Sequence, residues 1–201
     1  MPDLHDETSM AGTEQGEIAP AAAARKRPRP GERRVQILQT LARMLEQPGA
    51  ERITTAALAA QLDVSEAALY RHFASKAQMF EGLIEFIETS VFTLINQVVE
   101  REPQPSIQAQ KICVLVLQFG EKNPGMTRVM VGDALVFEHE RLIARMNQFF
   151  DRVESQLRQC LRPAAEASGS ATPTVDANAM ASAITACPSA VGCPSWRWCS
   201  Q

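Results

Sequence analysis

The stretch "VSEAALYRHFASK", which runs from Val64 to Lys76, decides the fold, because it predicts one short helix and the start of another. Ser65 is a good helix N-cap, and the segment from Glu66 to His72 has the composition of a helix. Ser75 is the next N-cap, so Lys76 falls in the first turn of the following helix.

Another short helix is predicted just before this stretch, within "RITTAALAAQLDV". Thr54 or Thr55 can serve as its N-cap, and the helix extends from Ala56 to Leu62 with Leu58 and Leu62 facing inward. Asp63 then occupies a turn position, where Asp tolerates left-handed backbone geometry better than most residues. Two short helices joined by a turn of about three residues form a helix-turn-helix.

The second helix of this pair presents a cluster of polar groups. Leu69 and Phe73 are four residues apart and should face the core. The residues outside that face are Glu66, Ala67, Tyr70, Arg71 and His72. In a helix-turn-helix the second helix enters the major groove, where phenol, guanidinium and imidazole groups reach phosphates or base edges. Lys76 beside a helix N-terminus suits a phosphate. A generic amphipathic helix pair is the alternative, but it does not explain the clustering.

The charge distribution supports a polyanionic partner, although the net charge of the chain is −3. Residues 1–24 hold five acids and no Lys or Arg. Residues 25–77 hold ten basic and five acidic residues, a local charge of +5, and residues 78–201 carry −3. Because charges act within a Debye length of ~8 to 10 Å, the local sign is the one that DNA meets.

Residues 1–30 read as a disordered segment with a basic end, "RKRPRP", in which Pro28 and Pro30 exclude a helix. This run is either a solvated linker or an arm that lies on phosphates or in a minor groove.

The rest of the chain has helical periodicity, which predicts an all-α protein. Further helices are expected at residues 31–49, 75–100, 106–125, 126–135, 137–162 and 175–186, with a loop in "PAAEASGSATPT" after residue 162. The helix at 106–125 is apolar nearly all round from Ile112 to Phe119, so we expect it to be buried on most sides. The apolar face between Leu142 and Leu157 is expected to be exposed in a monomer and to promote aggregation.

The helix-turn-helix segment resembles the DNA-binding domain of the tetracycline-repressor (TetR) family. The matching positions are Thr55, Val64, Ser65, Leu69, Tyr70, His72, Phe73 and Lys76, whereas Asp63 stands where the family usually has Gly. The resemblance implies a helix-turn-helix domain at 31–77, a helical effector and dimerisation domain at 78–186, and a homodimer on palindromic DNA. The implied DNA-binding residues are Thr54, Thr55, Ser65, Glu66, Ala67, Tyr70, Arg71, His72 and Lys76.

One branch of this family, the nucleoid occlusion factors, is more similar than the rest over about residues 33–162. The stretches that carry the resemblance are "RITTAALAA", "VSEAALYRHFASK", "LIEFIE", "FGEKNPG" and "MNQFFDRVESQLRQ". Members of this branch disrupt polymers of the division GTPase FtsZ when they are bound to DNA, so the C-terminal tail of FtsZ is an implied partner.

The resemblance places the groove for that tail at Phe86, Leu115, Lys122 and Asn123. Phe86 and Leu115 can form an apolar slot, and Lys122 can pair with an acidic residue. For each of them a plainer interpretation stays open, with the two apolar residues in the core and Lys122 as a solvated charge. Leu94 stands where the branch can carry an arginine, so we expect this chain to lack one polar contact to the tail.

Residues 187–201, "CPSAVGCPSWRWCSQ", depart from the family, which continues here with a long amphipathic helix. Pro188 and Pro194 exclude that helix. The spacing of the three cysteines is not that of a zinc site, and disulfides are rare in the cytosol. A shift of the coding frame after about Ala186 explains the tail, and a genuine divergent tail is the alternative.

Other features of the sequence limit the classes of function that the protein can have. No apolar stretch reaches the ~18 to 20 residues that span a bilayer, and the N-terminus lacks a secretory signal, so we expect a cytoplasmic, nucleoid-associated protein without a membrane partner. Cys113 and Cys160 read as buried free thiols. His139 is not part of a metalloprotease pattern, and no phosphate loop or nucleophile elbow occurs, which argues against an enzyme, a metal or a cofactor. A ligand-responsive repressor is the alternative function, because fold alone does not separate the two.

Overall fold

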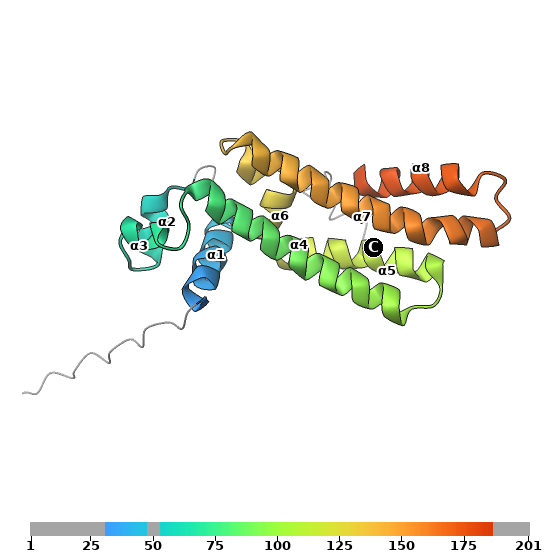
Figure 1. Ribbon diagram of the computed structural model, residues 1–201, viewed down its shortest axis with the longest axis horizontal. Coiled ribbons are helices and arrows are strands. Elements are labelled where there is room, and N and C mark those ends of the chain that lie inside the picture. Colours follow the sequence, from blue (N-terminus) through green and yellow to red (C-terminus); the bar gives the residue numbers. More distant parts are fainter. Residues whose placement is uncertain (1–30, 48–52, 187–201) are drawn as a thin grey trace, which may run out of the picture.

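The computed structural model describes residues 31–47 and 53–186, and every regular element within these ranges is helical (Figure 1). The elements are α1 (Glu32–Leu45), α2 (Thr55–Gln61), α3 (Glu66–Tyr70), α4 (Lys76–Arg101), α5 (Pro105–Lys122), α6 (Pro124–Met130), the 3₁₀ turn η1 (Asp133–Leu135), α7 (Glu140–Ala167) and α8 (Pro173–Ala186). The all-α prediction is confirmed. The basic segment 1–30 and the tail 187–201 lie outside the described residues.

Three helix starts follow the N-caps that the sequence predicts. The hydroxyls of Thr54, Ser65 and Ser75 accept hydrogen bonds from the backbone three residues on, at 3.1, 3.3 and 3.2 Å. Each cap satisfies an N–H group that the first helical turn leaves without a partner. Asp63 has φ 54°, the one non-glycine residue with positive φ in the described part of the chain. The tight turn between α2 and α3 is therefore as predicted.

The second helix of the pair, α3, is shorter than expected. It ends at Tyr70, two residues before the predicted end. The amides of His72 and Phe73 both donate to the Leu69 carbonyl, at 2.9 and 3.1 Å, and this turn closes the helix. Arg71 and His72 therefore lie in the exit turn of α3, not within it.

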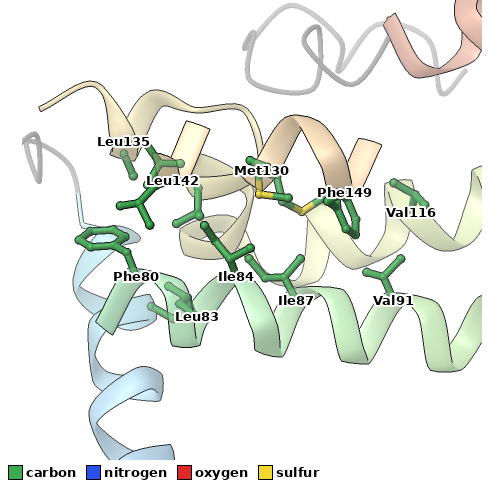
Figure 2. Close-up of a cluster of buried hydrophobic side chains, with 14 of the residues drawn as sticks. Phe80, Leu83, Ile84, Ile87, Val91, Val116, Met130, Leu135, Leu142 and Phe149 are labelled. Carbon is green, nitrogen blue, oxygen red and sulfur yellow. The ribbon is translucent and has the colours of Figure 1, made fainter. Parts of the chain in front are cut away.

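The core of the body is built around α4, which runs from the helix-turn-helix end of the molecule to the opposite end (Figure 1). Figure 2 shows its apolar side chains meeting those of α5, α6, η1 and α7. The labelled residues are Phe80, Leu83, Ile84, Ile87, Val91, Val116, Met130, Leu135, Leu142 and Phe149, and all of them are buried. Within the described ranges α4 alone has the length and hydropathy of a membrane span, but its inward side is this core.

The burial predicted for α5 is wrong in part. Ile112 and Val116 are buried, but Val114 and Leu117 are 44% and 40% exposed. The buried positions of α5 recur at three- and four-residue spacing, which is one face of a helix. The opposite face is apolar in sequence, yet it has no covering element within the described chain.

Two predictions about α7 are also corrected. The helix continues through Pro163 to Ala167, where a loop was expected. Proline keeps a helical φ, so the helix loses one backbone hydrogen bond there without ending. Its apolar face is buried, since Leu142, Met146 and Leu157 are at most 2% exposed. This face is therefore not an aggregation surface.

The junction between the helix-turn-helix end and the body is close-packed. A Cβ atom on Gly125 of α6 would lie 2.0 Å from the carbonyl oxygen of Ala42 in α1. The Arg128 side chain donates to the carbonyl of Leu45 at 3.0 Å, near the C-terminal end of α1. The helix expected at residues 126–135 is divided at Gly132, which has φ 83°.

The two cysteines of the described chain differ. Cys160 is buried as predicted, whereas Cys113 is only half-buried. Burial raises the pKa of both thiols above the usual value, so neither is an activated nucleophile.

Candidate nucleic-acid interface

The polar cluster of α3 lies on the solvent side of the helix-turn-helix. Leu69 and Phe73 are each 1% exposed, and this burial fixes which side of α3 faces inward. Tyr70 is 45% exposed, and Arg71 and His72 are also exposed. The same holds for Glu66 and Ala67 at the start of α3. The structure therefore brings the predicted α3 and exit-turn residues together on one accessible surface.

The N-terminus of α2 is tied to the N-terminus of α3. The Thr55 hydroxyl donates to the Glu66 carboxylate at 2.6 Å, which links two of the predicted residues. Thr54 and Ser65 use a hydroxyl oxygen as an acceptor in their caps. A hydroxyl group has one donor as well, so both residues can still donate to a phosphate.

Lys76 is engaged in a way that the sequence does not reveal. Its ammonium group forms an ion pair with Glu138, and the two side chains are only 23% and 11% exposed. The same ammonium lies 5.7 Å from the centroid of the Phe80 ring. Glu138 is 62 residues away in sequence, so no local pattern could have identified it. The charge of Lys76 is therefore already balanced by a carboxylate.

The four predicted groove residues differ in exposure. Phe86 on α4 is 43% exposed and Lys122 at the end of α5 is exposed. Leu115 is half-buried against the core. The Asn123 side chain donates to the carbonyl of Phe119 at 2.7 Å, where α5 ends. Phe86 is thus not a core residue, whereas the core interpretation of Leu115 is correct in part.

A cavity lies elsewhere in the body. It has a volume of about 630 Å³ and lies between α5, α7 and α8. Ala109, Leu161 and Met180 contribute to its apolar lining. Asp176 also lines it, but its carboxylate accepts hydrogen bonds from Ser170 and Thr172. Within the described ranges no group of three His, Cys, Asp or Glu residues is arranged to hold a metal ion.

Two family models match this chain. Residues 37–83 match the family described as bacterial regulatory proteins, tetR family. Residues 104–190 match the family described as tetracyclin repressor-like, C-terminal domain. The second match extends past residue 162, where the resemblance was expected to fade.

Relatives and solved structures agree with these matches. The chain is 54% identical over 153 residues to the nucleoid occlusion factor SlmA of Photobacterium profundum, covering 76% of this chain and 78% of the relative. It is 59% identical over 133 residues to the SlmA of a Marinomonas species, covering 66% and 68%. The TetR-family regulator PfmR from Thermus thermophilus superimposes with a TM-score of 0.62 at 20% identity, over 76% of this chain and 84% of PfmR, which shows the shared fold. The chain belongs to the TetR family and, within it, to the nucleoid occlusion factors named SlmA.

Proposed function

We propose that this chain is a DNA-binding nucleoid occlusion factor that binds palindromic chromosomal sites and antagonises FtsZ polymerisation there. The observation that carries the DNA-binding part is the exposure of Tyr70, Arg71 and His72 beside the buried pair Leu69 and Phe73. A helix held in this way presents its outer side to a major groove. The other proposed DNA-binding residues are Thr54, Thr55, Ser65, Glu66, Ala67 and Lys76. Such a protein acts on the nucleoid, in the cytoplasm.

The FtsZ part of the proposal is supported by the exposure of Phe86 and Lys122. An exposed aromatic side chain is in contact with water, and its burial against a partner protein is favourable because apolar surface is removed from water. Lys122 adds a positive charge at the end of α5 for an acidic tail residue. These two side chains can be changed without opening the core.

The decisive experiment measures FtsZ polymers by sedimentation, with GTP and with this protein added alone or together with a palindromic DNA duplex. The proposal expects a loss of pelleted FtsZ that depends on the specific duplex. An equal effect with scrambled DNA, or none with either, contradicts it.

A second candidate, a ligand-responsive repressor, is favoured by the cavity of about 630 Å³ between α5, α7 and α8. Small-molecule sites have volumes of about 300 to 1,000 Å³ and mainly apolar linings. A repressor would lose its affinity for DNA when a compound fills this cavity, and its sites would lie at one or a few promoters.

A further inference from the structure

The helix α3 is too short to fix its own orientation. It has five residues, and an isolated helix of this length is not stable in water. Burial of Leu69 and Phe73 determines which side faces inward, but two residues four apart still allow the helix to tilt. A further contact at the exit turn is therefore expected to matter for how α3 meets DNA.

Arg34 of α1 makes that contact. The central carbon of its guanidinium lies 4.2 Å from the centroid of the Phe73 ring. Its Nη1 atom donates a hydrogen bond to the backbone carbonyl of His72, at 3.1 Å. The planar group thus covers the buried aromatic residue and binds the turn that carries Arg71 and His72. Arg34 is 38 residues before His72 in sequence, so the contact joins α1 to the exit turn of α3.

We propose that Arg34 is a positioning residue for DNA recognition, which holds the exit turn of α3 against α1 and so sets the angle of α3 in the groove. The inference rests on the proposed DNA-binding function. A planar guanidinium can stack flat on a ring and donate in its own plane at the same time, whereas a lysine ammonium has no plane to stack. The two contacts therefore favour arginine over lysine at this position.

Arg33 provides a matched control. It is the neighbouring residue of α1, has the same charge, and donates to Gln36 within its own helix at 2.9 Å. Arg34→Met and Arg33→Met each remove one positive charge from the same end of α1. Differences between these variants therefore report the contacts of Arg34 and not the loss of charge.

The test measures affinity for a palindromic duplex and for a scrambled duplex at several salt concentrations. Arg34→Met is expected to weaken specific binding about tenfold while nonspecific binding falls no more than in Arg33→Met. Arg34→Lys is expected to restore the salt dependence but not the preference for the palindrome. If Arg34→Met leaves that preference unchanged, or Arg34→Lys restores it fully, the positioning role is wrong.

Hydrogen exchange in the free protein separates this inference from the DNA-binding proposal. The amides of His72 and Phe73, which donate to the Leu69 carbonyl, are expected to exchange faster in Arg34→Met than in Arg33→Met. Failure of the wild-type chain to bind any duplex would reject the DNA-binding proposal. The exchange data would still test whether Arg34 stabilises the exit turn of α3. If Arg34→Met does not fold, Arg34→Lys takes its place in this comparison. Unchanged exchange in the folded variants overturns the inference.

Discussion

Lys76 shows how a single side chain can have the expected position and a different environment. The sequence places it in the first turn of α4, and the structure confirms that position. Its ammonium group, however, pairs with the Glu138 carboxylate, which comes from the segment between η1 and α7. The pair joins the start of α4 to the segment before α7, so Lys76 contributes to the stability of the fold.

Replacing Lys76 with alanine is therefore expected to destabilise the fold. The Glu138 carboxylate would remain mostly buried without its cation, at a cost of about 2 kcal/mol. The salt dependence of DNA binding should change by less than the ~0.9 unit per neutralised phosphate, because Lys76 is already paired. Glu138→Gln, which frees the ammonium, should increase the salt dependence. Urea denaturation and titrations at several salt concentrations test both variants, and a full-unit decrease with unchanged stability for Lys76→Ala contradicts this account.

Gly125 allows α6 to approach the backbone of α1 closely. Alanine is a better helix former than glycine, so substitution in a helix is expected to stabilise it by up to ~1 kcal/mol when space allows. At Gly125 the added Cβ would lie 2.0 Å from the Ala42 carbonyl oxygen, and we expect a net loss of about 3 kcal/mol. Gly82→Ala is the control, because the atoms that its Cβ would meet belong to the side chains of Phe73 and Leu38. Urea denaturation midpoints test the two variants. Equal losses of stability in both would show that the close contact between α1 and α6 does not explain the effect at Gly125.

At the scale of the helices, the features that the sequence predicts best are those that depend on neighbouring residues. The caps at Thr54, Ser65 and Ser75 and the left-handed turn at Asp63 are confirmed, because each depends on a few neighbouring residues. The outer face of α5 was mispredicted because apolar composition does not reveal whether another element covers that face. The polar cluster of α3 could be predicted from spacing, but the partners of Lys76 and of the α3 exit turn come from distant segments.

We expect substitutions of exposed side chains on α4 and α5 to affect the action on FtsZ without affecting DNA binding. Phe86→Ala and Lys122→Glu are expected to leave the affinity for the palindrome within about twofold, because both side chains are exposed and stability should change by less than ~0.5 kcal/mol. Both should abolish the effect on FtsZ polymers. Val114→Ala, another exposed apolar position on α5, is the control that should keep it. Unfolding of Phe86→Ala would show instead that Phe86 supports the core.

At the scale of the whole molecule, α5 and α8 each keep exposed apolar side chains that no element of the described chain covers. Val175 and Met180 of α8 are exposed, whereas Ala177 and Ala181 pack inward. The sequence alone could not predict which apolar side chains of α5 and α8 are exposed, because that depends on which helix faces are covered by other helices of the same chain. The tail 187–201 lies outside the described residues, so its two prolines remain the basis for predicting how the chain assembles.

We expect the chain with this tail to be monomeric or weakly dimeric at micromolar concentration. A stable interface buries about 1,200 Å² or more in total, and a helix interrupted at Pro188 and Pro194 offers too little. Because two half-sites about one helical turn apart (~34 Å) require a rigid dimer, binding to the palindrome should be weak. Analytical ultracentrifugation checks this, and a tight dimer would show that the tail supports assembly.

The distribution of binding sites on the chromosome tests the central claim most directly. Genome-wide mapping of crosslinked protein in the cells that carry it distinguishes nucleoid occlusion from promoter regulation. We expect many palindromic sites that are scattered over the chromosome and absent around the terminus. Sites confined to one or a few promoters would contradict it and would identify the protein as a repressor.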